Sequence, residues 1–108
     1  MLSFDVREQP GETVTVWMSG ELSGEVWTDH VLEFLEEHYV NDGVRTIVLD
    51  LSELEFIDLE GVATLLTLLR KSGERGKSFR IRGAGGYARE KLRTTGVLDR
   101  LENASGSG

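Results

Sequence analysis

The chain has 108 residues, enough for one domain with a single core, and its apolar residues (39%) are clustered as in globular proteins. The formal net charge of −7 argues against nucleic acid or anionic lipid as the main partner, because both attract positive patches. The chain has no cysteine, which excludes disulfides, a thiolate nucleophile and cysteine metal ligands. No apolar stretch approaches the roughly 20 residues that span a bilayer, and the first residues do not resemble a signal peptide. We therefore expect a soluble, cytoplasmic protein.

The first part of the chain predicts a β-hairpin followed by a helix. Apolar and polar residues alternate over residues 2–8 and again over 13–20, with a Pro-Gly turn between them. Over residues 24–40 the apolar residues recur at helical spacing, and acidic residues occupy the other side. Ser23 is the expected N-cap of this helix. Trp17 should point away from the apolar side of its strand and, if exposed, would mark a second contact patch.

The middle of the chain predicts a central strand and an apolar helix. Residues 45–52 contain a continuous apolar run, which is typical of a parallel strand buried on both faces. Residues 54–57 read as a short connector. The following helix, from Leu59 to about Lys71, should bury one apolar face, made of Val62, Leu65, Leu66 and Leu69.

The last part predicts a strand over residues 78–82 and a helix over about 87–95 that ends at Gly96. Residues 97–101 should anchor the end of the domain through Val97, Leu98 and Leu101. The order is β-β-α-β-α-β-α, which indicates an α/β fold: a β-hairpin, then αβαβα, with helices packed on a mixed sheet. We expect one domain over residues 1–102 and a flexible, linker-like tail over 103–108.

The start of the second helix carries an unusual set of residues. Asp58 directly precedes the apolar period and is the natural N-cap. Glu60 falls in the first turn, where the helix dipole favours an anion by about 0.3–1 kcal/mol. Gly61 costs roughly 1 kcal/mol relative to alanine inside a helix, and we interpret it as steric access for a partner. Further along, Glu60, Thr64, Thr67 and Lys71 form a polar stripe, either a solvated face or a partner surface.

Three stretches together resemble the STAS domain, the module shared by anti-sigma-factor antagonists and the tails of sulphate transporters. "MSGELSG" (18–24) is similar to the family's strand-end motif, and "TIVLDLSELEFID" (46–58) to its central strand. "IDLEGVATLLTLLRKSGERGK" (57–77) resembles the turn, helix and loop of the regulatory site. A further stretch, "LRTTGVLDRL" (92–101), fits the helix end that follows. The resemblance covers nearly the whole chain and implies the STAS fold.

The resemblance implies a specific role for the turn before the second helix. In anti-sigma-factor antagonists this turn reads Asp-Ser-Ser-Gly or Asp-Ser-Thr-Gly, and the partner kinase phosphorylates the residue before the glycine. Here Asp58 and Gly61 match, Leu59 departs from the usual serine, and Glu60 stands at the phosphoacceptor position. A phosphoserine carries a charge of about −1.5 to −2 and three acceptor oxygens, so glutamate is a permanent, partial imitation of it.

The resemblance therefore implies a non-enzymatic interaction module of bacterial transcription regulation by partner switching, without cofactor or metal. Its expected partner is an anti-sigma factor with a kinase-like ATP-binding fold, and Glu60 either prevents binding or makes it constitutive. Two alternatives remain open: a STAS subunit of an ABC lipid transporter, and a weak nucleotide-binding protein that uses the glycines of residues 83–86. The expected partner-binding residues are Gly20, Glu21, Leu22, Ser23, Asp58, Leu59, Glu60, Gly61, Thr64 and Thr67.

Other groups of residues give weaker indications of a metal, phosphorylation or catalytic site. His30 and His38 share a helix with several acids, but a zinc site needs a ligand from another element, so we expect no metal. Ser52 and Thr64 are weak alternative phosphorylation sites, because hydroxyl groups of this kind are ordinary in strands, turns and helices. No arrangement of residues predicts a catalytic triad.

Overall fold

The computed structural model describes residues 2–9, 12–40 and 43–96. A mixed sheet of four strands has the spatial order β1-β2-β3-β4. The first pair is antiparallel and the other two pairs are parallel. The predicted hairpin, the parallel central strand and the mixed sheet are therefore confirmed. The strands are β1 (Ser3–Gln9), β2 (Thr13–Leu22), β3 (Thr46–Ile57) and β4 (Ser78–Arg82).

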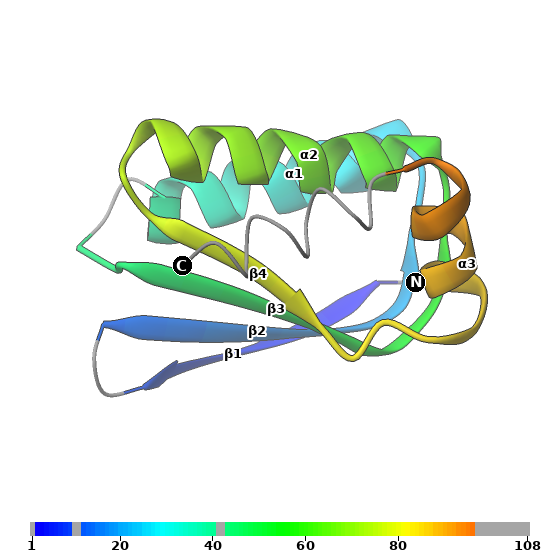
Figure 1. Ribbon diagram of the computed structural model, residues 1–108, viewed down its shortest axis with the longest axis horizontal. Coiled ribbons are helices and arrows are strands. Elements are labelled where there is room, and N and C mark those ends of the chain that lie inside the picture. Colours follow the sequence, from blue (N-terminus) through cyan, green and yellow to red (C-terminus); the bar gives the residue numbers. More distant parts are fainter. Residues whose placement is uncertain (1, 10–11, 41–42, 97–108) are drawn as a thin grey trace.

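The helices follow the predicted order along the chain. They are α1 (Glu25–Leu35), continued by the π-helix η1 (Glu36–Val40), α2 (Leu59–Glu74) and α3 (Gly86–Thr94). Figure 1 shows α1 and α2 side by side on one face of the sheet, with α3 at the end where α2 begins. In the part of the chain that the structure describes, no helix is both long and apolar enough to cross a membrane.

One hydrophobic core fills the space between the sheet and the two long helices. The apolar residues that alternate along β2, Val14, Val16 and Met18, are all buried, as the alternation predicts. Alternate residues of a strand point to the same face, which is why these three meet the helices together. The core continues through the central strand and the helices, mainly with Ile47, Leu49, Leu51, Val31, Leu35, Leu65 and Leu68.

The start of α1 differs from the prediction that Ser23 caps it. The N-cap is Gly24, with φ 83° and ψ 134°, a conformation that glycine adopts readily. The amide of Gly24 donates a hydrogen bond of 3.0 Å to Oδ2 of Asp58, thirty-four residues further along the chain. A tertiary contact therefore sets where this helix begins. At its other end, His38 is exposed and stacks on Phe34.

The predicted connector at residues 54–57 is wrong, because these residues belong to β3. The strand runs on to Ile57, and its register with β2 shifts twice, between Trp17 and Ser19 and between Gly20 and Glu21. Such shifts interrupt the alternation of buried and exposed side chains and bend the strand. The broken alternation made this strand end look like a loop in the sequence.

The buried face of α2 is also different from the predicted one. Leu66 and Leu69 are only partly buried, whereas Leu68 is fully buried and Thr64 is 5% exposed. Thr64 donates a hydrogen bond of 3.0 Å to the carbonyl of Glu60, which satisfies its hydroxyl inside the protein. Lys71 forms an ion pair of 2.6 Å with Glu36 of η1. The predicted polar stripe is therefore partly covered, because α2 packs against α1 and η1 as well as the sheet.

The end of the described chain agrees with the sequence. Gly96 has φ 77° and its amide donates to the carbonyl of Arg93, as expected for a glycine that ends a helix. The glycines before α3 form a short connection, and Gly83 also has a positive φ of 75°. The predicted anchor at Val97, Leu98 and Leu101 and the tail at 103–108 lie outside the described residues.

The buried carboxylate of Asp50 on β3 is stabilised by several donors. It accepts hydrogen bonds from the amide (2.9 Å) and hydroxyl (2.6 Å) of Ser52 and from Nε of Arg82 (2.8 Å). Burial alone would raise the pKa of Asp50, but the bonds from Ser52 and Arg82 outweigh it and hold the pKa below its usual value. Ser52 is thus part of this network inside the strand, and β3 continues beyond it to Ile57.

Acid should remove the stability that the Asp50 network supplies. A carboxylate with a lowered folded-state pKa stabilises the protein above its unfolded-state pKa of about 3.9, and this contribution is lost as the pH falls through the folded-state value. We expect Asp50→Asn to lower the free energy of unfolding most above about pH 4. The difference between variant and wild type should shrink as the pH falls towards about 2. Urea denaturation at several pH values measures this. A difference that is constant with pH would contradict it.

Candidate functional site

Asp58 joins two segments at one end of the molecule: the start of α2 and the loop between β2 and α1. Its Oδ1 accepts a hydrogen bond of 2.9 Å from the amide of Gly61, which confirms it as the N-cap of α2. Its Oδ2 accepts from the amide of Gly24, and its own amide donates to the carbonyl of Leu22. Both oxygens of one carboxylate thus hold the two segments in a fixed relation.

The predicted site residues divide by exposure. Leu59 is 64% exposed, and Glu60 and Glu21 are exposed as well. Half-buried positions are Gly20, Ser23, Asp58 and Thr67. Three predicted contact residues, Leu22, Gly61 and Thr64, are buried, so they offer little surface to a partner and support the exposed residues from below. Partner contact by the others stays a prediction.

Gly61 has a different role from the predicted one. A Cβ atom at this position would lie 2.3 Å from the carbonyl oxygen of Leu22 and 2.7 Å from Cγ1 of Ile57. Both distances are far inside van der Waals contact, so the close approach of α2 to the ends of β2 and β3 requires glycine. The interpretation of Gly61 as steric access for a partner is therefore wrong, and its cost in helix propensity has an internal cause.

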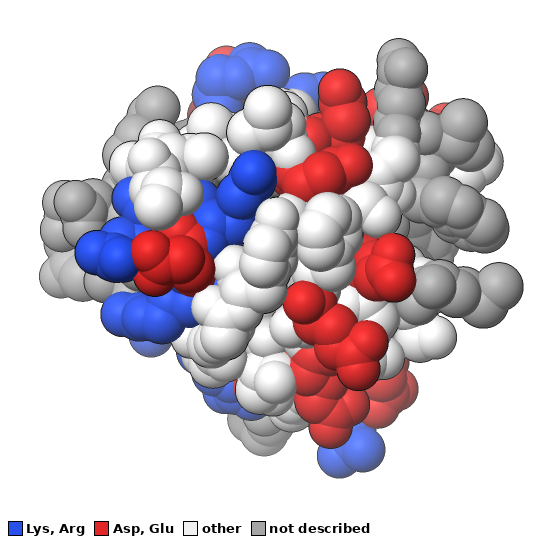
Figure 2. Space-filling model, turned by 90° about the vertical axis from the view of Figure 1, so that its right-hand side faces the viewer, with Lys and Arg blue, Asp and Glu red and all other residues white. Residues whose placement is uncertain are grey.

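Glu60 lies on the exposed side of the first turn of α2. Glu21 and Glu55, near the ends of β2 and β3, are exposed as well. Figure 2 looks at this end and shows an uncharged ridge with acidic side chains on one side and basic ones on the other. A partner that covers the acidic side must supply positive charge.

An aromatic pair at the same end was not predicted from the sequence. The rings of Phe56 and Tyr87 stack with centroids 4.9 Å apart and an interplanar angle of 18°. The sequence predicts a connector at Phe56 and only the start of a helix at Tyr87. The helical period of α3 was a usable signal, because Ala88 and Leu92 are its buried residues and leave Tyr87 outside.

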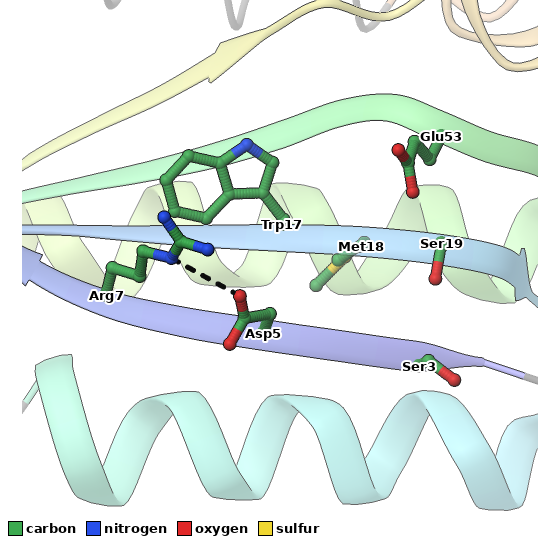
Figure 3. A pocket seen from close by; sticks show the side chains of 7 residues that line it. All are labelled: Ser3, Asp5, Arg7, Trp17, Met18, Ser19 and Glu53. Atoms are coloured by element: carbon green, nitrogen blue, oxygen red, sulfur yellow. Dashed lines mark ion pairs between the residues drawn. The ribbon is translucent and has the colours of Figure 1, made fainter.

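Trp17 lies on the sheet face opposite α1 and α2 and is half-buried. The guanidinium groups of Arg7 and Arg82 lie 5.3 and 5.4 Å from its ring centroid, within cation–π range. Arg7 also pairs with Asp5 at 3.4 Å (Figure 3). At the predicted second contact patch, Trp17 therefore already contacts two arginines of the same chain. A cavity of about 430 Å³ adjoins it, lined by Ser3, Asp5, Arg7, Trp17, Met18, Ser19 and Glu53.

The remaining candidates receive little support as sites. Burial of Thr64 removes it as an accessible phosphorylation site, and the Ser52 hydroxyl is bonded to Asp50. Within residues 2–9, 12–40 and 43–96, no three His, Cys, Asp or Glu side chains are grouped to hold a metal ion. A Cβ on Gly83 would lie 3.0–3.2 Å from atoms of Asp50 and Ser52, so this glycine also serves the packing of its turn.

Comparison with known proteins agrees with this geometry. The model of the family described as "Mlab, STAS domain" matches residues 6–102. The chain is similar to an anti-sigma factor antagonist from Mycobacterium paratuberculosis, at 26% identity over 99% of this chain and 93% of that one, with a TM-score of 0.76. None of the curated proteins matches the chain.

Two structures of the anti-sigma factor antagonist SpoIIAA share the fold. The unphosphorylated form is 20% identical over 88% of this chain and 82% of that one, with a TM-score of 0.76. The phosphorylated form, from Bacillus, is 20% identical over 90% and 86%, with a TM-score of 0.71. The α/β fold with a mixed sheet and its resemblance to these proteins are thereby confirmed.

Proposed function

Because this chain belongs to the STAS domain family, we propose that it is a non-enzymatic module that binds a protein partner through the start of α2 and the β2–α1 loop. The observation that carries the proposal is the exposed pair Leu59 and Glu60, on a helix start that Asp58 fixes to the neighbouring loop. A rigid surface loses little entropy on binding, which favours recognition there.

The proposed partner is an anti-sigma factor with a kinase-like ATP-binding fold. The similarity to anti-sigma factor antagonists over nearly the whole chain supports this class of partner. This chain would compete with a sigma factor for the same surface of the anti-sigma factor, and the sigma factor would be released. In this scheme the module acts in transcription regulation inside the cell.

Glu60 makes this binding constitutive in our proposal. It stands at the position that matches the family's phosphoacceptor, and a glutamate cannot be phosphorylated or dephosphorylated as serine is. Burying a carboxylate in an interface without a cation costs several kcal/mol, so the partner must place an arginine or lysine opposite it. The exposed acids around Glu60 fit a partner with a basic surface.

Changing the charge of Glu60 should therefore weaken binding. The test starts by isolating a tagged chain with its partner from its native cells and identifying the partner by mass spectrometry. Calorimetry then compares wild type with Glu60→Lys, Glu60→Ala and Glu60→Ser. We expect losses of about 2–5 kcal/mol for Glu60→Lys, which is roughly a 30-fold or greater rise in Kd, and smaller losses for the other two.

The matched control is Glu74→Lys, which makes the same charge change at the far end of α2, also at an exposed position. Its affinity should stay near that of wild type. If all three Glu60 variants bind the partner as tightly as wild type, Glu60 only stabilises the helix start. If Glu60→Ser binds the partner more tightly than wild type, the glutamate hinders binding. If the isolated partner is a transporter ATPase, the result favours the alternative of an ABC-transporter subunit.

A further inference from the structure

We infer that the partner surface extends from α2 onto the stacked pair Phe56 and Tyr87, and that the partner covers it with an apolar pocket bordered by arginine or lysine; this inference rests on the proposed function. Among the described side chains, Leu59 and Tyr87 are the exposed large hydrophobic ones, at 64% and 50%. Both belong to the same end of the molecule, where α2 and α3 begin (Figure 1).

The aromatic pair is held in place by three elements. Phe56 is near the end of β3, and the register of the sheet pairs it with Glu21 of β2. Paired residues of parallel strands point to the same face, so Glu21 stands next to Phe56. Tyr87 reaches the pair from α3, which packs against β3 and is anchored by the buried Ala88 and Leu92. The pair is therefore a fixed platform and not a loose side chain.

Stacking on Phe56 still leaves half of Tyr87 exposed. A single exposed apolar residue is common on protein surfaces, but here apolar side chains from three separate elements gather at one end. Aromatic residues of this kind are enriched where binding energy concentrates in interfaces. The platform thus extends the apolar surface that Leu59 begins at the acidic helix start.

The charges next to the platform specify the chemistry of the partner. Glu21 lies beside Phe56 in the register, and Glu55 and Glu60 are exposed nearby in the sequence. A guanidinium or ammonium group of the partner can lie over the open face of Tyr87 as a cation–π contact and reach a carboxylate at the same time. Figure 2 shows acidic side chains on one side of the uncharged ridge and basic ones on the other, so the arginine or lysine of the partner fits on the acidic side.

Site-specific photo-crosslinking in the native cells tests this inference. The photoreactive residue p-benzoyl-phenylalanine replaces Tyr87, Leu59 or, as a control at the far end of α2, Glu74. We expect the 59 and 87 variants to form adducts with the same protein, identified by mass spectrometry, and the 74 variant to form none. If the 59 variant forms an adduct with a protein and the 87 variant forms none with that protein, the inference is overturned and the proposed function stands. Absence of an adduct at both positions overturns both.

A second measurement separates contact from mere proximity. The partner that the 59 variant identifies is purified, and its affinity for wild type is compared with its affinity for two Tyr87 variants. Tyr87→Ser should raise Kd at least tenfold. Tyr87→Phe should keep Kd within about threefold of wild type, because the ring supplies the contact. Thermal unfolding checks that both variants are folded. Equal affinities for Tyr87→Ser and wild type would remove the aromatic pair from the interface.

Discussion

Replacing Leu68 by alanine should lower the free energy of unfolding by about 2–5 kcal/mol, the range for a large side chain removed from a core. Leu68 is 0% exposed and belongs to the core between α2, α1 and the sheet. The loss combines the transfer free energy of the missing atoms with the cavity that remains. Urea denaturation followed by circular dichroism measures it, provided that the transition is two-state.

The adjacent Leu69→Ala variant is the matched control. Leu69 is only partly buried at the edge of the core, so the same chemical change should cost about 1 kcal/mol. The helical period of the sequence predicted the opposite, with Leu69 in the buried face. Equal losses for the two variants, or a larger loss for Leu69→Ala, would show that α2 is rotated relative to the structure described above.

Gly61→Ala is expected to destabilise the protein by about 3 kcal/mol, at the upper end of the usual cost of overpacking. The new Cβ would meet the backbone carbonyl oxygen of Leu22 at 2.3 Å, and a backbone atom cannot move aside as the end of a side chain can. Relief requires α2 to shift away from β2, which would also strain the hydrogen bonds of Asp58. The measurement is again the unfolding free energy, together with partner affinity.

Gly73→Ala tests the same substitution in the same helix without the clash. A Cβ at Gly73 would meet nothing within 4 Å, so the variant should gain up to about 1 kcal/mol from helix propensity. Opposite signs for the two variants would confirm that Gly61 is kept for packing. A neutral Gly61→Ala would instead return the glycine to the role of partner access that the sequence suggested.

The features that depend on neighbours along the chain could be predicted from the amino-acid sequence. Alternation of residue types predicted the hairpin, and the continuous apolar run from Ile47 predicted the buried parallel strand. Asp58 as the N-cap of α2 and Gly96 at the end of α3 were also confirmed. These features follow from local hydrogen bonding, backbone conformation and side-chain period, all of which act over a few residues.

Other features depend on contacts between residues far apart in the sequence, and these could not be predicted from it. The bond from Gly24 to Asp58 sets the start of α1, and contact with Leu22 and Ile57 explains Gly61. The buried face of α2 is fixed by two neighbours at once, the sheet and α1, whereas a helical period alone leaves its rotation free. Phe56 and Tyr87 meet across thirty-one residues, because α3 folds back onto the end of β3.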